Sequence, residues 1–291
     1  ICPSKRKVVK LYWISLSFDF DAYSLWIARG MTNYTNLSSG EFASVGVKRI
    51  LKLLREYNIK ATFFIPGHTA EYFPEDVGMI KDEGHEIGHH GYIHEAPETI
   101  NNPEEEKRII ELGIESLKRV ANVVPRGYRS PSWALTRYTL SILEELGFIY
   151  DSSLMGNDYT PYRPLLYVYV ESGGKIVKGP PSKLVEIPVH WSLDDFPHFE
   201  YVIYPHYIQQ GLRSVSDVFE NWTLDFEYMV RNLDEGVITY TFHPEIIGRG
   251  HRMMLLERLI RYIKDHPKSK EIKFATLAEI ADVYRKKLGI G

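Results

Sequence analysis

The sequence predicts an α/β fold in which about seven parallel strands close into an irregular barrel. Short runs rich in β-branched and aromatic residues alternate with longer stretches whose apolar residues recur at helical spacing, as in βαβ units. Acidic, basic and histidine side chains repeatedly follow the expected strands. In a parallel barrel such positions meet at the carboxyl ends of the strands, which is the face where active sites form.

The first 122 residues carry three strand-to-helix repeats. The strands are rich in β-branched and aromatic residues, and Pro66-Gly67 stops the second one. The last helix begins with Pro103 and three glutamates, which suit the positive end of a helix dipole. The expected strands are 8–18, 61–65 and 86–88, and the expected helices are 42–57, 74–83 and 103–122.

The rest of the chain continues the alternation around an irregular middle. Prolines and tyrosines are frequent between residues 152 and 206, and Ser172-Gly173-Gly174 predicts a hairpin turn. We expect this middle part to form inserted loops or a hairpin over the carboxyl face. The expected strands are 127–130, 148–151, 165–170, 175–177, 184–189, 237–242 and 273–274, and the expected helices are 137–146, 215–232, 251–264 and 276–287.

Composition indicates one globular domain over residues 1–291. The chain is 44% hydrophobic and 25% charged, enough to bury a large core, and it has no linker or internal repeat. A formal net charge of −3 and the absence of a Lys/Arg stripe exclude nucleic acid as an expected partner. The sequence leaves open whether the protein is a homo-oligomer.

The cysteine count and the N-terminus favour a cytoplasmic protein with no membrane partner. Cys2 is the single cysteine, which excludes an intramolecular disulfide and fits a reducing compartment. A basic segment precedes an apolar run, but Lys10 interrupts that run and Asp19 follows where a signal peptide would have small residues. No apolar run reaches the length of about 18 residues that a transmembrane helix needs.

Four of the eleven histidines lie in residues 84–94, a segment that supports two interpretations. His85, Glu86 and His89 spell H-E-x-x-H, which binds zinc only when it lies on one helix. Three glycines in the segment oppose a helix, since each costs about 1 kcal/mol relative to alanine. We therefore expect a short strand there, with His90 and His94 as the metal-binding pair and His85 and His89 as non-ligands.

Five clusters at expected strand ends suggest a metal-assisted hydrolase. Asp21, His90 and His94 offer one carboxylate and two imidazoles, which suits a catalytic divalent ion, with zinc as the expected metal. We assign Asp19 as the general base for the attacking water, with Arg129 holding it ionised. His243, which we expect Asp151 to support, would protonate the leaving nitrogen.

These residues resemble the polysaccharide deacetylases with the NodB homology domain, carbohydrate esterase family 4. The family's two-aspartate motif resembles Asp19-Phe20-Asp21 with one residue inserted, and its His-Ser/Thr-x-x-His motif resembles residues 90–94 with Gly91 at the hydroxyl position. Arg129-Ser130-Pro131 and His243-Pro244 resemble its later motifs. The resemblance covers residues 8–285 and implies an Arg that braces the base and a late His that acts as acid.

Several stretches resemble one branch of that family, which includes intracellular peptidoglycan deacetylase homologues and cyclic amidohydrolases similar to allantoinase and cyclic imidase. We therefore rank first a deacetylase of an N-acetylated sugar or related small amide, because a cytoplasmic enzyme would not meet a cell-wall polymer. The alternatives are a cyclic amide hydrolase and a catalytically silent sugar-binding module. The expected substrate contacts are Trp133, Trp191, Asp195 and, at the rim, His251.

Overall fold

A computed structural model describes residues 10–100 and 102–290 of the chain. Cys2, the basic segment at residues 5–7 and the start of the first expected strand lie outside the described residues. In the described part, seven strands pair in parallel in the order β11-β1-β2-β3-β4-β5-β8. The strands are β1 (Leu11–Asp19), β2 (Thr62–Ile65), β3 (Glu86–His89), β4 (Gly127–Tyr128), β5 (Tyr150–Asp151), β8 (Val185–Glu186) and β11 (Glu235–Phe242).

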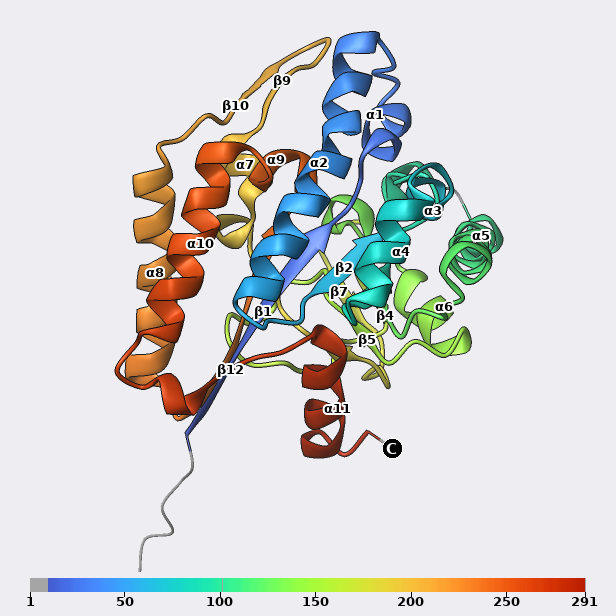
Figure 1. The fold of residues 1–291 in the computed structure, drawn as a ribbon. Coiled ribbons are helices and arrows are strands. Elements are labelled where there is room, and N and C mark those ends of the chain that lie inside the picture. The colour runs from blue at the N-terminus through green and yellow to red at the C-terminus, as the bar shows by residue number, and fades with distance from the viewer. Residues whose placement is uncertain (1–9, 101, 291) are drawn as a thin grey trace, which may run out of the picture.

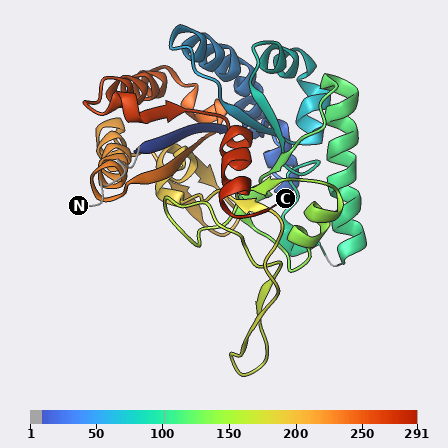
Figure 2. The same ribbon diagram turned by 90° about the horizontal axis from the view of Figure 1, so that it is seen from below.

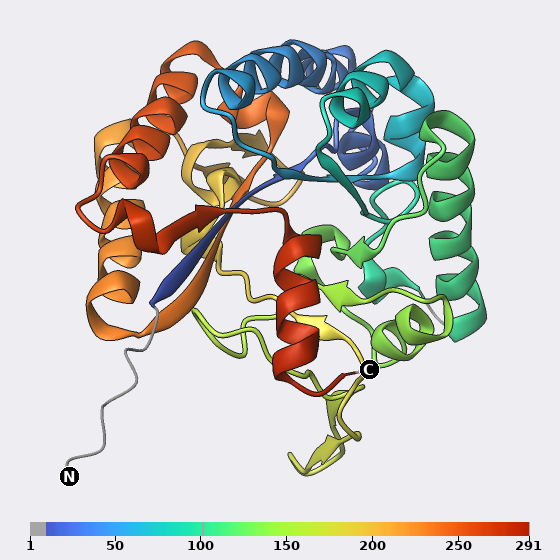
Figure 3. The same cartoon turned by 60° about the horizontal axis from the view of Figure 1, so that its bottom comes forward.

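The sheet curls into an irregular barrel, which confirms the predicted fold class (Figure 3). The amino-terminal half of β1 pairs on one side with an eighth strand, β12 (Ile272–Phe274), and its carboxyl end pairs on the same side with β2. Between β8 and β11, the described residues form only an isolated parallel bridge, which joins Asp194 to Thr241. The barrel is therefore closed most loosely at that seam.

Helices surround the barrel, and a separate set of short elements covers its carboxyl end (Figure 1). The long outer helices bury their apolar stripes against the strands, with Ile50, Leu54, Phe226 and Leu259 in one continuous core. The outer helices are α2 (Tyr34–Glu56), α4 (Pro74–Asp82), α5 (Pro103–Ala121), α6 (Thr139–Glu145), α8 (Val215–Asn232) and α10 (Gly250–Lys264). None of the helices formed by residues 10–100 and 102–290 is long and apolar enough to cross a membrane.

The amino-terminal end of the barrel is closed by α11 (Leu277–Lys287) (Figures 1 and 3). Its buried Leu277, Ile280 and Tyr284 pack in one cluster with Trp13 of β1 and Val185 of β8. Thr276 caps the helix in a capping box with Glu279, which fixes where the helix begins. Because this end of the barrel is plugged, ligand access is left to the opposite, carboxyl end.

The sequence predicted the long elements but missed the short ones at the carboxyl end. Helix α2 begins eight residues earlier than expected because Asn33 caps it through the backbone N–H of Asn36. The elements that sequence patterns did not indicate are too short to show a period. They are α1 (Tyr23–Ala28), α3 (Gly67–Tyr72), α7 (Asp195–Phe199), α9 (Pro244–Ile247), the antiparallel strands β9 (Tyr201–Ile203) and β10 (Ile208–Gln210), and the 3-10 turns η1 (Pro97–Thr99), η2 (Pro131–Trp133), η3 (Trp191–Leu193) and η4 (Ser269–Glu271).

The predicted hairpin in the middle of the chain is confirmed as β6 (Val168–Val170) and β7 (Ile176–Lys178). Its position differs from the expectation, because it projects away from the barrel instead of lying over the carboxyl face (Figure 2). The inserted segments that do reach the carboxyl face are η3 and α7, which come directly after β8.

Candidate active site

Strand ends place the candidate residues around one cavity. Asp19 is the last residue of β1, and His90, Arg129 and His243 each follow directly after β3, β4 and β11. Asp21 lies two residues beyond Asp19. Because these strands are parallel, their carboxyl ends meet at one face, so Asp19, Asp21, His90 and His243 line the same cavity although they lie up to 224 positions apart. Arg129 does not line the cavity but contacts Asp19, which does.

The residue inserted between the two aspartates is accommodated in the core. Phe20 is fully buried, its ring packs against Phe73, and its backbone N–H donates to the carbonyl of Phe64 at 2.9 Å. Because the side chain of Phe20 lies in the core, Asp19 and Asp21 both face the cavity. The insertion therefore keeps the two carboxylates on one side.

The backbone conformation at position 91 also explains why this residue is glycine. Its φ is +74°, a left-handed conformation that glycine adopts without steric cost. A Cβ there would lie 3.1 Å from a Glu95 carboxylate oxygen and from Pro131. His94, three residues later, also has a positive φ of 60°. Such backbone strain in a non-glycine residue is characteristic of functional sites.

Asp21, His90 and His94 form a buried group whose ligand atoms all lie within 4.8 Å of one another. Oδ1 of Asp21 is 3.4 Å from Nε2 of His90, and Oδ2 is 3.5 Å from Nε2 of His94. Nδ1 of His90 lies 2.7 Å from the carbonyl of Arg129, so Nδ1–H donates there and Nε2 keeps its lone pair free. The three side chains are arranged as a metal site would require.

Two further observations fit a divalent cation at this group. Oδ1 of Asp21 is buried and accepts no hydrogen bond from residues 10–100 and 102–290, which would be costly without a cation. Burial lowers the pKa of His94 well below its ordinary value, with the charge of His90 as a second cause, so its imidazole is neutral and able to coordinate. Carboxylate and neutral imidazole are ligands that zinc accepts.

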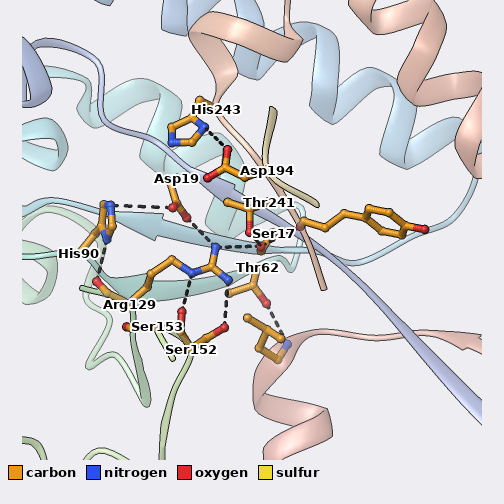
Figure 4. Close-up of polar contacts among 12 residues, drawn as sticks. Ser17, Asp19, Thr62, His90, Arg129, Ser152, Ser153, Asp194, Thr241 and His243 are labelled. Carbon is orange, nitrogen blue, oxygen red and sulfur yellow. Dashed lines mark hydrogen bonds and ion pairs between the residues drawn. The ribbon is translucent and has the colours of Figure 1, made fainter. Parts of the chain in front are cut away.

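Arg129 holds Asp19 in its ionised form (Figure 4). Nη1 of the fully buried Arg129 donates to Oδ1 of Asp19 at 2.8 Å, and also to Ser17. Its remaining bonds go to the carbonyl and hydroxyl of Ser152, both at 3.0 Å. Burial by itself would raise the pKa of Asp19, but the charge of Arg129, assisted by His90, reverses this effect and lowers it below the usual value.

His243 is supported by Asp195, where the sequence predicted Asp151. Nδ1 of His243 lies 2.7 Å from Oδ1 of Asp195, and the backbone N–H of His243 donates to both oxygens of that carboxylate at 3.1 Å. Asp194 lies on the same side at 3.6 Å. Burial would lower the pKa of His243, but these two aspartates raise it well above the ordinary value. Nε2 points to the group formed by Asp21, His90 and His94 and lies 3.7 Å from Oδ2 of Asp21.

Asp151 therefore does not make the contact that we expected. Its carboxylate accepts a hydrogen bond from Ser153 Oγ at 2.8 Å and adjoins Glu186, and it does not line the cavity. Burial raises its pKa to about 6. The expectation failed because Asp151 ends a strand, where a site residue is expected, whereas Asp195 begins α7, and only the path of the chain after β8 brings Asp195 beside His243.

The cavity has a volume of about 60 Å³, room for a group of a few heavy atoms. Trp133 and Trp191 stack in its wall with ring centroids 4.1 Å apart, and Trp191 keeps 42% of its surface exposed. Ser132 and Trp133 both have left-handed φ values, 53° and 52°. The lining residues are Asp19, Asp21, Leu25, Arg29, His90, His94, Ser132, Trp133, Trp191, Asp194, Phe196 and His243.

Two expected substrate contacts do not reach this cavity. Asp195 is fully buried behind His243, and His251 is exposed at the start of α10, so neither lines the wall. Sequence reasoning missed Leu25, Arg29 and Phe196, which come from short elements without a periodic signal. Asp194 lines the cavity and also lies beside His243, with its Oδ1 3.6 Å from Nδ1.

The H-E-x-x-H segment is a strand, as expected, and its two histidines have structural contacts. Nδ1 of His85 accepts the backbone N–H of Ala61 at 3.1 Å. Nδ1 of His89 accepts the N–H of Gly91 at 3.1 Å, and its Nε2 lies 2.9 Å from the carbonyl of Ile110. Neither histidine lines the cavity.

The chain is similar to known deacetylases in sequence. Residues 37–150 match the family model described as polysaccharide deacetylase. A peptidoglycan deacetylase of Helicobacter pylori is 35% identical over 292 residues, which cover 94% of this chain and 96% of that protein. A peptidoglycan deacetylase-like protein of Gibberella zeae is 32% identical, with 96% of this chain and 87% of that protein covered.

Solved structures of other proteins have a similar fold. A Mycobacterium smegmatis protein assigned to the polysaccharide deacetylases has a TM-score of 0.84 at 32% identity, with 99% of this chain and 95% of that chain covered. An allantoinase structure has a TM-score of 0.75 at 21% identity, with 97% and 92% covered. At that identity the likeness to the allantoinase concerns the fold alone.

Proposed function

The chain belongs to the polysaccharide deacetylase family, and from this membership we propose that it removes the acetyl group from an N-acetylated sugar with the help of a divalent ion, zinc. As a member of that family it is a hydrolase of carbon–nitrogen bonds other than peptide bonds. The observation that carries the proposal is the buried Oδ1 of Asp21, which has no hydrogen-bond partner in the part of the chain that the structure describes. The Nε2 atoms of His90 and His94 lie next to the Asp21 carboxylate.

Asp21, His90 and His94 would hold the ion. When bound, it would polarise the amide carbonyl and lower the pKa of water. The chain supplies the remaining chemistry. His90 is kept in the required tautomer by the carbonyl of Arg129, so the orientation of this ligand is fixed before any ion arrives.

Asp19 and His243 are proposed to move the protons. The ionised Asp19, held by Arg129, takes a proton from the attacking water, whose oxygen bonds to the acetyl carbon. Nε2 of the protonated His243 then gives a proton to the sugar nitrogen as the carbon–nitrogen bond breaks, leaving acetate and a free amine. Both residues line the cavity beside Asp21, which supports this division of roles.

A cyclic amide hydrolase is the second candidate, and the small cavity of about 60 Å³ is the observation that favours it. The deciding experiment incubates zinc-loaded protein separately with N-acetylglucosamine oligomers, allantoin and succinimide. Acetate release from the oligomers supports the proposal, and ring opening alone supports the second candidate. Binding of the oligomers without turnover of any of the three would instead indicate a catalytically silent sugar-binding module.

A further inference from the structure

Arg252 is a buried charged residue that the proposed chemistry does not use. It lies in the first turn of α10, its side chain is buried, and it does not line the cavity. Burying a guanidinium is unfavourable unless its N–H donors and its charge find partners. The contacts of Arg252 therefore indicate what the buried charge does.

The guanidinium of Arg252 joins the two short helices that begin at or next to Asp195 and His243. Its Nη2 donates to the carbonyl of Phe199 in α7 at 3.0 Å, and its Nη1 donates to the carbonyl of Ile246 in α9 at 3.2 Å. It also lies over the ring of Phe199, with its central carbon 4.9 Å from the centroid. Helix α7, helix α9 and the start of α10 are thus connected at the carboxyl end of the barrel (Figure 1).

Both helices are too short to hold their own positions. Helix α7 has five residues and begins with Asp195, and α9 has four residues and follows directly after His243. Isolated helices of this length are not stable in water, so tertiary contacts must place them. The hydrogen bonds from Arg252 reach carbonyls near the carboxyl ends of both helices and so restrict how their amino-terminal residues face each other.

The charge of Arg252 also acts on Asp195. Burial raises the pKa of Asp195, whereas the hydrogen bond and the charge of His243 oppose this rise, and the charge of Arg252 adds to that opposition. Arg252 therefore favours the ionised carboxylate, which is the form that accepts a hydrogen bond from Nδ1 of His243.

We propose that Arg252 positions the His243–Asp195 pair by holding α7 and α9 in their mutual orientation. This inference rests on the proposed function, in which His243 protonates the leaving nitrogen, and adds a residue that acts through His243. Without Arg252, the pair loses the 2.7 Å contact that occupies Nδ1 and directs Nε2 toward Asp21. Because Arg252 does not line the cavity, it is a positioning residue and not a catalytic one.

The first test measures steady-state deacetylation of N-acetylglucosamine oligomers by the zinc-loaded wild type and Arg252→Met. The variant keeps an unbranched apolar chain but removes the charge and both hydrogen bonds. We expect kcat to fall at least about tenfold and KM to stay within about twofold, because a misplaced catalytic group affects the reaction more than binding. A rise in KM with an unchanged kcat would overturn the proposal.

Arg249→Met is the matched control for this test. Arg249 immediately precedes α10 and stacks on an aromatic ring, with its central carbon 3.6 Å from the centroid of Phe42. Within residues 10–100 and 102–290, its side chain donates no hydrogen bond to α7 or α9. The control should keep the wild-type kcat, and a loss of kcat equal to that in Arg252→Met would overturn the proposal.

Arg252→Gln and zinc titration separate positioning from general damage to the fold. The neutral amide of Arg252→Gln can donate to one carbonyl, so its kcat should lie between those of the wild type and Arg252→Met. Zinc affinity, measured by calorimetry, should be unchanged in both variants because neither removes a proposed ligand. If both variants lost zinc affinity in parallel with kcat, the role of Arg252 would be purely structural and the proposal would be wrong.

A double-mutant cycle tests whether Arg252 acts through Asp195. In the Asp195→Asn background the pair is already broken, so adding Arg252→Met should lower kcat by less than about twofold. If the two substitutions instead lowered kcat additively, Arg252 would act independently of the pair, which contradicts the proposal.

Proton NMR supplies a readout that needs no substrate. The short charge-assisted hydrogen bond from Nδ1 of His243 to Asp195 should give a resonance at low field, identified by its absence from His243→Gln. We expect it in the wild type and Arg249→Met, and expect it to be lost in Arg252→Met. Its persistence in Arg252→Met, or its absence from the wild type, would overturn the proposal. A wild type without deacetylase activity would count against the proposed function alone, and this resonance would still decide the role of Arg252.

Discussion

Asp195 holds both the side chain and the backbone of His243, 48 residues away: one carboxylate accepts from Nδ1 at 2.7 Å and from the backbone N–H at 3.1 Å. The pairing fixes which imidazole nitrogen faces the cavity, because Nδ1 is occupied and Nε2 points to Asp21. It also favours the protonated imidazole. A residue assigned by sequence to substrate binding therefore lies in position to orient the proposed acid.

The first prediction concerns this pairing and the alkaline limb of the pH–rate profile. The raised pKa of His243 keeps its proton up to high pH, so activity should fall as pH rises through that pKa. Asp195→Asn removes a negative charge, lowers the pKa of His243 and should move the alkaline limb to lower pH. Asp151→Asn is the matched control and should leave the limb in place. If the alkaline limb moved only in Asp151→Asn, Asp151 would be the residue that supports His243, as the sequence predicted.

The second prediction concerns the metal ligands. Asp21→Ala and His94→Ala should each weaken zinc binding by at least about 100-fold, because each removes one of three protein ligands. Isothermal titration of apoprotein with zinc measures the effect. His251→Ala, at an exposed position outside the cavity, is the control and should bind zinc as the wild type does. Unchanged affinity in either ligand variant would exclude this site.

The third prediction separates the base from the ligands. Asp19→Asn should lower kcat by about 10² to 10⁴-fold, the usual contribution of a general base. Zinc affinity should stay within a few-fold of the wild type, since Oδ1 of Asp19 bonds to Arg129 and Asp19 is not needed to complete the ligand group. Steady-state kinetics and zinc titration on the same preparation check both parts. If Asp19→Asn kept the wild-type turnover, another residue would act as the general base.

The fourth prediction concerns the stacked indoles. Trp191→Ala should raise KM about 2- to 10-fold and change kcat little, because aromatic contacts contribute about 0.5–1.5 kcal/mol beyond burial. The exposed face of Trp191, stacked on Trp133, is available to a sugar ring at the cavity wall. Wild-type tryptophan fluorescence should change on substrate addition. An unaltered KM together with silent fluorescence would remove Trp191 from the binding surface.

The fifth prediction concerns the buried Asp151 and the free energy of unfolding. Its folded-state pKa of about 6 exceeds the ordinary 3.8, so the folded protein binds the proton more tightly and loses stability as pH rises across that interval. Asp151→Asn cannot ionise. Its stability relative to the wild type should therefore be greater at pH 7 than at pH 4, by about 2 kcal/mol. Urea unfolding at the two pH values measures the difference, and an equal difference at both would contradict a raised pKa of the buried Asp151 carboxyl.

The sequence by itself determined the barrel and most of the residues around its cavity. Long periodic stretches indicated the outer helices, and side chains at strand ends or just after them, such as Asp19, His90 and Arg129, meet at one face in any parallel barrel. Three glycines were enough to exclude a helix from residues 84–94, where the structure has β3.

Only the tertiary structure decided which residues touch. Asp151 ends β5 and Asp195 begins α7, and the isolated bridge between Asp194 and Thr241 places Asp195, and not Asp151, beside His243. Arg29 follows directly after a six-residue helix that has no periodic signal, and its place at the cavity is known only from the folded structure. A sequence pattern indicates local geometry and the order of strands along the chain. Contacts between loops depend on packing across the whole barrel.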